Sequence, residues 1–438
     1  MNLLYQTKCK KIFHNAKLYG NQYLKRCPYM KTDNMIETKR HFPILLALAL
    51  TLGVFAAGSE ELVISPLLPD LAQTFHSSID VLALSISMYG IMILVGAPLL
   101  VPIGDKYSRE LCLMIGLSLF IIGTVICAAA QDLYTFFLGR ALSGLAAGAF
   151  VPTAYAVVGD RVPYQYRGKV MGLIVSSWSL ALIFGVPLGA FIGGSLNWRW
   201  TFWIFAFMGL LVLALVLYEA RGSASGKAGQ ENGEQPAGTF FRALRVPRVP
   251  VYITITFCNM TGFYGMYSYL GTYLQQVFSG GNTVAGLFIM IYGIGFSMSV
   301  FSGKAADRFG KMRSLVIAMA VLSILLACLP YAPKSLPLLC IGLLIWGVMQ
   351  SLTVTLLSTI LSDCSQHHRG KIMAFYSLAS NLAVTLGSAV MGPVYIRYGY
   401  SFVGLICAAI TLCGFVLSVY GYKRYSTHDQ NMEETLHQ

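Results

Sequence analysis

The sequence predicts an all-α membrane protein with twelve transmembrane helices arranged as two pseudo-symmetric six-helix bundles. Of its 438 residues, 56% are hydrophobic and only 11% are charged, whereas a soluble protein carries about 25% charged residues. A helix crosses a hydrocarbon core in roughly 20 residues, and the apolar residues suffice for twelve such segments. Motifs also recur at one fixed offset along the chain. These observations exclude a soluble globular fold, a coiled coil and a collagen-like chain.

The apolar runs follow one another along two halves of the chain. The first half, residues 42–220, contains six runs, at about 43–69, 79–103, 111–130, 134–158, 169–194 and 199–218. The second half, residues 249–421, contains six more, at about 249–277, 284–303, 314–332, 336–361, 372–395 and 401–421. Runs of this length, joined by short polar loops, are typical of transmembrane helices.

Three polar segments flank the two halves. Residues 1–41 contain nine Lys and Arg but no apolar core of a signal peptide. We expect a basic cytoplasmic tail that is disordered or, if the chain starts at Met30 or Met35, partly untranslated. Residues 221–248 begin with a stretch rich in Gly, Ser, Gln and Glu, which is typical of a flexible cytoplasmic linker. Residues 422–438 are expected to form a second cytoplasmic tail.

The distribution of basic residues predicts the orientation of the chain. If both termini lie in the cytoplasm, the tails and loops on that side hold 27 of the 31 Lys and Arg. The other side holds three, Arg199, Lys334 and Arg397. Basic loops stay on the cytoplasmic side, so we expect a multi-pass protein of the plasma (inner) membrane with both termini cytoplasmic. The net charge of +13 therefore reports topology and does not indicate nucleic-acid binding.

The sequence offers no catalytic or metal-binding cluster at membrane depth. All seven His lie in tails, loops or span ends, and no two of the ten Cys have CxxC spacing. Neither a zinc site nor a histidine base is therefore predicted. No G-x-x-x-x-G-K-(S/T) loop occurs, which argues against an ATP-binding domain. We expect no enzyme activity, no metal and no cofactor.

Two loops reveal an internal repeat and a family resemblance. The loop after the second run contains Asp105, Lys106 and Arg109, and the loop after the eighth contains Asp307, Arg308 and Lys311, each 202 residues further on. The second loop closely resembles the G-x-x-x-D-(R/K)-x-G-(R/K) signature of the major facilitator superfamily, and the first resembles it more loosely. An acid held between basic residues makes charge-assisted bonds. We expect these bonds to break and reform as the two halves rock.

Two further stretches resemble motifs of the twelve-span drug:proton antiporter branch of that superfamily. Gly139 to Gly148 resembles its R-x-x-x-G-x-x-x-(A/G) motif, with Arg140 as the basic residue. The fifth run contains Gly185, Pro187, Gly189 and Gly193, which resemble the antiporter motif. The three glycines are spaced by four, so they share one helix face, and they serve close helix packing, gating, or both. The resemblance implies export of the substrate, as in sugar-efflux and multidrug-efflux permeases.

Glu60 and Glu61 are the two acids predicted to lie at membrane depth. A carboxylate is costly there unless it is paired or protonated. Our hypothesis is that Glu61 carries a proton, that Glu60 assists or binds a cationic substrate, and that Arg140 tunes the carboxylate by its charge. Which glutamate carries the proton stays open. The alternative is that a glutamate pairs with Arg140 only to stabilise helix packing.

Polar and aromatic residues inside the runs are candidates for binding a substrate. The seventh run is the richest, and its candidates are Asn259, Tyr264 and Tyr267. Trp178, Gln350 and Asn381 are further candidates. Phenol rings and amides suit bulky, partly apolar compounds, although each of these residues could equally serve packing.

Together these features predict a proton-coupled secondary transporter that exports a small organic compound by alternating access between the two halves. The alternatives are a sugar or metabolite efflux permease and, from a different class, a membrane sensor that binds a ligand without flux. We expect a monomer whose partners are a small-molecule substrate, protons and the lipid bilayer. The identity of the substrate and the proton stoichiometry stay open.

Overall fold

The structure is a computed structural model that describes residues 44–222, 244–298, 310–365 and 368–437. These described residues form helices and no strand. Ten helical segments among them are long and apolar enough to cross a membrane. Two predicted spans are not among the ten, because α11 is described over only 17 residues and α10 is rich in Tyr, Thr, Asn and Gln. The predicted all-α membrane fold of two six-helix bundles is confirmed.

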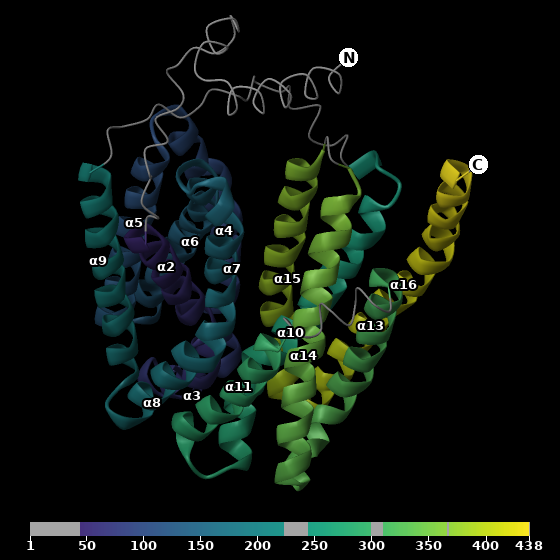
Figure 1. Ribbon diagram of the computed structural model, residues 1–438. Helices are drawn as coiled ribbons and strands as arrows, with labels where there is room; N and C mark the ends of the chain where they lie inside the picture. The colour runs from purple at the N-terminus through teal and green to yellow at the C-terminus, as the bar shows by residue number, and fades with distance from the viewer. Residues whose placement is uncertain (1–43, 223–243, 299–309, 366–367, 438) are drawn as a thin grey trace, which may run out of the picture. The chain divides into compact units, whose positions relative to one another are not determined.

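The first half contains six spans, two of which are divided (Figure 1). Its helices are α2 (Ile44–Leu62), α3 (Ile64–Thr74), α4 (Ile79–Lys106), α5 (Arg109–Ala129), α6 (Leu133–Arg161), α7 (Tyr164–Leu180), the π-helical turn η3 (Ala181–Gly185), α8 (Val186–Ser195) and α9 (Trp198–Gly222). The first span consists of α2 and α3, and the fifth consists of α7, η3 and α8.

The second half repeats this order of helices. It contains α10 (Val249–Val277), α11 (Gly281–Ser297), α13 (Lys311–Cys328), the 3-10 turn η6 (Leu329–Lys334), α14 (Leu336–Asp363), α15 (Arg369–Tyr398) and α16 (Tyr400–His437). Helices α5 and α13 begin 202 residues apart, and so do α9 and α16. The offset of the sequence motifs is therefore also the offset of the helices.

The last helix extends beyond the predicted span. The apolar run ends near residue 421, but α16 continues to His437. No Gly or Pro interrupts residues 422–437, so the helix continues into the segment that we expect to form the cytoplasmic tail. The predicted tail 1–41 and most of the predicted linker 221–248 lie outside the described residues.

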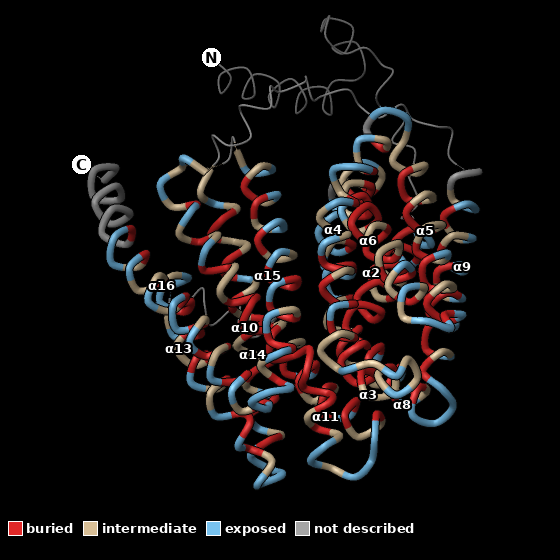
Figure 2. The backbone as a smooth tube through the Cα atoms, turned by 180° about the vertical axis from the view of Figure 1, so that it is seen from behind, coloured by how far each residue is buried: buried red, intermediate tan, exposed pale blue. Residues whose placement is uncertain are grey.

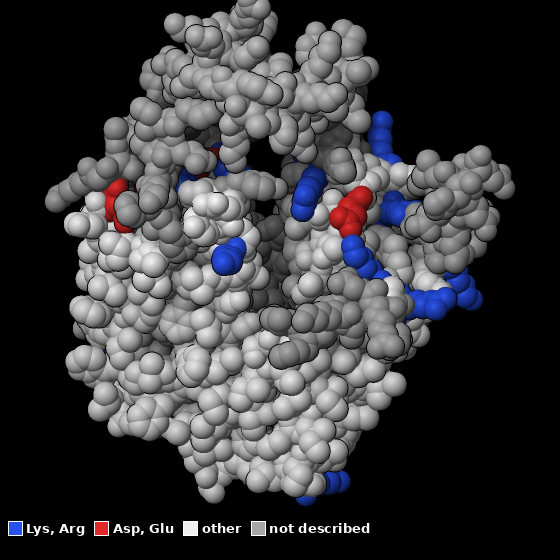
Figure 3. Space-filling model, viewed as in Figure 1, with Lys and Arg blue, Asp and Glu red and all other residues white. Residues whose placement is uncertain are grey.

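The helix bundle has two ends, where successive helices are joined. We call the end where α4 is followed by α5, α6 by α7 and α14 by α15 the basic end. The end with the loops 75–78, 130–132, 196–197, 278–280 and 399 is the opposite end. Figure 3 shows that most visible Lys and Arg lie toward the basic end. It also shows the surface hollowed between the two halves at this end.

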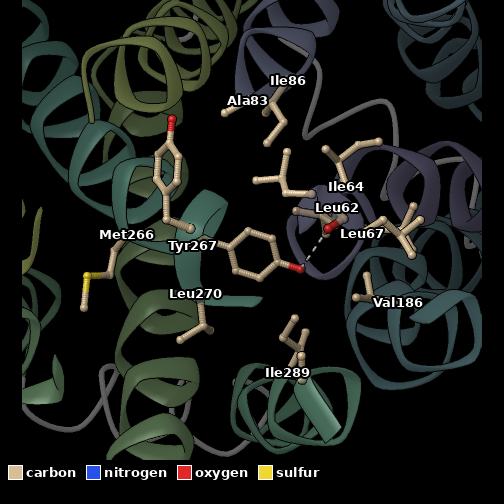
Figure 4. Packing of buried hydrophobic residues seen from close by; sticks show 14 of the residues in the cluster. Leu62, Ile64, Leu67, Ala83, Ile86, Val186, Met266, Tyr267, Leu270 and Ile289 are labelled. Atoms are coloured by element: carbon tan, nitrogen blue, oxygen red, sulfur yellow. Dashed lines mark hydrogen bonds between the residues drawn. The ribbon is translucent and has the colours of Figure 1, made fainter. Parts of the chain in front are cut away.

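The two halves pack together near the opposite end. Helix α3 packs on α10, α4 packs on α15, and η3 and α8 pack on α11. One large apolar cluster contains residues of both halves, such as Leu67 and Ile289, and Figures 2 and 4 show this buried region. Nearer the basic end, separate clusters draw on one half each, around Leu100 and around Leu357. The halves are thus joined by apolar packing at the opposite end.

Proline in α3 releases a backbone acceptor for the contact between the halves. Pro66 has no N–H, so the carbonyl of Leu62 loses its helical donor. The Tyr267 hydroxyl of α10 donates to this carbonyl oxygen at 3.3 Å (Figure 4). The Ser65 hydroxyl donates to the Tyr267 carbonyl oxygen at 2.6 Å and accepts from the Gly271 N–H at 3.1 Å. These bonds connect the first span of each half.

The glycine stripe of the fifth span permits close packing on the first span. A Cβ atom added to Gly185, Gly189 or Gly193 would lie within 2.7 Å of Ser59, Val63 or Leu67, respectively. These three partners are also spaced by four residues, so the two helix faces match over several turns. Pro187 of the same stretch contacts the other half, since a Cβ on Gly286 of α11 would lie 3.1 Å from its Cα.

We expect Gly189→Ala to lower the thermal stability of the purified protein. The added methyl would meet Val63 at 2.7 Å and Thr201 at 2.9 Å, and such overpacking costs about 1–3 kcal/mol. Gly172→Ala is the control, because a Cβ at Gly172 meets nothing within 4 Å and should stabilise the helix by up to about 1 kcal/mol. Equal melting temperatures by intrinsic fluorescence for both variants would contradict the close packing.

Candidate functional site

Glu60 and Arg140 form an ion pair inside the first half. Nη1 of Arg140 lies 3.3 Å from Oε1 of Glu60 and donates to the Glu60 backbone oxygen at 3.2 Å. The Thr124 hydroxyl donates to the other carboxylate oxygen, Oε2, at 3.2 Å. Both charged side chains are fully buried. The pair joins α2 to α6, and loss of either partner would leave an uncompensated buried charge.

An aromatic ring and two glycines complete the surroundings of Arg140. Its guanidinium carbon lies 4.3 Å from the centroid of the Tyr89 ring on α4, a cation–π contact. A Cβ on Gly144 or Gly148 would collide with the backbone of α4 at Tyr89 or Ile93. The glycines that follow Arg140 therefore bring α4 and α6 close enough for this stacking.

Glu61 contacts the other half of the protein. Its Oε1 accepts a hydrogen bond of 2.8 Å from the Tyr264 hydroxyl of α10. The Glu61 side chain is 4% exposed, and within the described part of the chain it forms no ion pair. Successive helical residues point about 100° apart. Glu60 therefore points into its own half, whereas Glu61 points to the interface between the halves.

Aromatic side chains of the second half surround the Tyr264 contact. The ring centroid of Phe263 lies 4.8 Å from that of Tyr264 and 5.8 Å from that of Trp346. Tyr292 of α11 lies 4.9 Å from Trp346. The Tyr292 hydroxyl and the Trp346 indole N–H are buried without a hydrogen-bond partner in the described structure. The cluster therefore retains two hydrogen-bond donors.

A pair of amides lies one helical turn from this aromatic cluster. The Asn259 amide nitrogen donates to the Gln350 oxygen at 3.3 Å, and the Gln350 nitrogen donates to the Asn259 oxygen at 3.0 Å. Both side chains are buried. Asn259 precedes Phe263 by four residues and Gln350 follows Trp346 by four. The amide pair and the aromatic cluster therefore form successive layers between α10 and α14.

The structure brings some candidate residues together and leaves others apart. Glu61, Tyr264 and Tyr267 lie at one interface, and Asn259 and Gln350 are bonded to each other. Trp178 packs in the first half, where a Cβ on Gly58 would lie 3.0 Å from its ring. Asn381 is half-buried on α15 and donates to the Ser377 carbonyl oxygen at 2.9 Å.

The motif loops form ion pairs within their own halves. Arg109 binds Asp160 at 2.8 Å, and Lys311 binds Asp363 at 3.0 Å. Arg109 and Lys311 begin α5 and α13, and the two acids lie at the ends of the following spans, α6 and α14, so the pairing is repeated in the two halves. Lys106 lies over the Tyr107 ring at 5.2 Å. The side chain of Asp105, and all of Asp307 and Arg308, lie outside the described residues.

Sequence reasoning missed several residues of this arrangement. Thr124, Tyr89, Tyr292 and Trp346 are single polar or aromatic residues in apolar runs, and nothing in the sequence distinguishes them from residues that serve packing. Asp160 and Asp363 could have been found, because they lie at nearly the same offset as the basic residues that they bind. The signal in the sequence is that an acid recurs in the second half at this offset, as the basic residues do.

Two repeated six-helix halves with a buried acid and aromatic side chains at their interface are the architecture of a membrane transporter. Comparison with known proteins identifies the family, since the Major Facilitator Superfamily model matches residues 50–335 and 282–435. The chain belongs to this family of transporters, which are not enzymes.

Relatives of known sequence agree with this assignment, and a solved structure shares the fold. The chain is 76% identical over 407 residues to the uncharacterized MFS-type transporter YwfA of Bacillus subtilis (strain 168), covering 93% of this chain and 99% of that protein. It is 26% identical over 381 residues to the inner membrane transport protein YdhP of Escherichia coli (strain K12), covering 85% and 95%. The crystal structure of a mutant of the nucleoside transporter NupG matches with a TM-score of 0.72 at 15% identity, covering 86% of this chain and 100% of that one.

We expect Arg140→Gln to destabilise the protein strongly, because it leaves the Glu60 carboxylate buried without a counter-charge. The cost should be about 3–5 kcal/mol. The double variant Glu60→Gln/Arg140→Gln should lose less, since no charge is then buried. The measurement is a double-mutant cycle of unfolding in detergent. Additive effects of the two single substitutions would show that the pair is not coupled.

Proposed function

We propose that the protein exports a small organic compound in exchange for protons and that Glu61 carries the proton. One observation carries this proposal: Glu61 is buried at the interface of the two halves, and its partner is a neutral hydroxyl. A carboxyl group in these surroundings can be ionised or neutral without breaking a salt bridge. Its protonation changes the contact between the halves, and alternating access changes the same contact.

The neighbouring glutamate is less suited to carry a proton. Glu60 has a permanent counter-charge in Arg140 and a hydroxyl donor in Thr124. Protonation of Glu60 would leave the guanidinium of Arg140 buried and unpaired, which is costly. We therefore assign Glu60 and Arg140 a structural role beside Glu61.

The orientation of the chain supports an inward-facing conformation. With the basic end in the cytoplasm, as the charge asymmetry favours, the packed opposite end faces outward. The hollow between the halves in Figure 3 then opens to the cytoplasm. We propose that a compound entering from the cytoplasm exchanges with a proton at Glu61, which lies at the interface between the halves. The direction of transport rests on the resemblance of Gly185 to Gly194 to the antiporter motif.

The side chains near Glu61 support a partly apolar substrate with hydrogen-bonding groups. The aromatic cluster around Phe263 supplies large apolar faces, and Tyr292 and Trp346 supply unpaired donors. The amide pair of Asn259 and Gln350 favours a second candidate function, sugar or metabolite efflux, because amides bind hydroxyl groups well.

Flux measured in proteoliposomes tests the proposed function. The purified protein is reconstituted and given a panel of dyes, antibiotics and sugars, with and without an imposed pH gradient. Substrate movement that depends on the gradient, together with proton movement reported by an internal pH dye, supports antiport. Binding without flux would favour a sensor, and flux without proton movement would favour a facilitator. Either result would contradict the proposal.

We expect Glu61→Gln to lose gradient-driven transport, because glutamine cannot exchange a proton. Transport with the gradient should fall to the level measured without it, whereas folding should be preserved since Gln still accepts a bond from Tyr264. Glu219→Gln, which removes a carboxylate at the end of α9, is the control and should transport like the wild type. Full gradient-driven transport by Glu61→Gln would exclude this residue as the carrier.

Tyr264→Phe should shift the pH dependence of transport while retaining the aromatic ring. The ionised Glu61 loses its donor at 2.8 Å, so its neutral form is favoured. The pH at half-maximal transport should therefore rise. Tyr273→Phe, which loses a bond to Pro330 away from Glu61, is the matched control. An unchanged pH profile for Tyr264→Phe would indicate that this hydrogen bond does not influence coupling.

A further inference from the structure

A charged side chain takes part in the contact between the halves at the opposite end. Asp70, near the end of α3, is half-buried, and its Oδ2 accepts a hydrogen bond from Nδ2 of Asn282 in the first turn of α11. The Asn282 side chain is buried. A hydrogen bond to a carboxylate is roughly twice as strong as one between neutral groups. This bond therefore joins the two halves more firmly than the neutral contacts around Tyr267.

Two glycines of α8 lie against the same amide. A Cβ on Gly193 would lie 3.6 Å from Nδ2 of Asn282. A Cβ on Gly194 would lie 3.4 Å from the Asn282 Cβ and 3.3 Å from the Thr283 hydroxyl oxygen. Helices α3, α8 and α11 thus meet around Asn282, and Figures 1 and 2 show them together at this end. Asn282 therefore contacts both divided spans of the first half.

The repeat of 202 residues gives this contact an equivalent in the chain. The position equivalent to Asp70 is Thr272 of α10, and the position equivalent to Asn282 is Asp80 in the first turn of α4. Asp80 also approaches the other half, since a Cβ on Gly392 of α15 would lie 2.9 Å from its Cβ. The Thr272 hydroxyl, however, is buried without a hydrogen-bond partner in the described structure, and so is Oδ1 of Asp80. The bond is thus formed at one of the two equivalent positions.

The two ends of the helix bundle differ in how the halves meet. The surface between the halves is hollowed at the basic end (Figure 3), whereas apolar packing and the bond to Asp70 close the opposite end. A transporter of this architecture gives its site access from one end at a time. When the opposite end opens, α3 and α11 must separate, because they belong to different halves. The bond between Asp70 and Asn282 then breaks, so it stabilises the closed state of this end.

We propose that Asp70 and Asn282 form a polar gate at the opposite end and act as positioning residues of the transport cycle. The formed bond favours the state in which this end is closed, and its loss favours the state in which this end is open. Thr272, the equivalent position without a bond, takes no part in the gate. The proposal follows from membership of a transporter family and holds whether or not the coupling ion is a proton.

Thiol modification of the full chain in detergent tests this gate. Ser388→Cys introduces the reporter, because Ser388 of α15 is fully buried and its Oγ lies 2.7 Å from that of Ser87 on α4, in the other half. A maleimide reacts with an accessible thiol, so the reporter reacts only while the halves are apart. We expect Asn282→Ala to raise its modification rate about tenfold, as loss of a hydrogen bond to a charged group should. Peptide mass spectrometry measures the rate.

Two native cysteines show whether each half stays folded in these variants. Cys112 lies in the first half and Cys407 in the second, and both are buried. Their modification rates should not change in Asn282→Ala. Thr272→Val is the matched control, because it removes a hydroxyl without a partner at the equivalent position. It should leave the rate of Ser388→Cys unaltered.

Exchange of the two partners separates the hydrogen bond from local packing. Asp70→Asn/Asn282→Asp again pairs a carboxylate with an amide, and the helix dipole favours an acid in the first turn of α11. This double variant should restore the slow rate. An unaltered rate in Asn282→Ala, an equal rise at Cys112 and Cys407, or a fast rate in the exchanged pair would each overturn the proposal. Because no transport is measured, a proteoliposome result against proton coupling leaves this test unaffected.

Discussion

The arrangement of the site depends on the buried ion pair between Glu60 and Arg140. A single charge in the hydrocarbon region is costly, and an opposite charge beside it offsets part of that cost. Thr124 and the Tyr89 ring contribute to this from two further helices. The pair therefore holds α2 in one rotational position against α4, α5 and α6. Since Glu60 points inward, Glu61 must point toward the second half.

The contact between the halves consists of small residues and of backbone groups that have no hydrogen-bond partner within their own helix. Pro66 leaves the Leu62 carbonyl without its helical donor, and Tyr267 supplies one from the other half. Gly271 lets α10 approach α3 closely enough for Ser65 to reach its backbone. These are polar contacts between uncharged groups. Such contacts can break in exchange for water at modest cost, whereas an ion pair buried in one half resists exchange.

Much of the fold and part of the site could be predicted from residue pattern. Few charged residues lie inside the predicted spans, so the sequence alone identifies Glu60, Glu61 and Arg140 as candidates for the functional site. Their pairing could not be predicted, because the sequence sets the angle between adjacent residues but not the helix that each one faces. Tyr264 was a candidate for binding a substrate, and its bond to Glu61 joins residues that are 203 positions apart.

The sequence by itself determined the number of spans, the repeat of 202 residues and the position of the basic loops. These properties follow from local composition, since the length of an apolar run and the charge beside it decide whether a segment crosses a bilayer. Only the tertiary structure decided that Arg140 pairs with Glu60 and that Glu61 meets Tyr264. Partner choice depends on helix rotation and close approach, which result from side-chain packing between segments far apart in the chain.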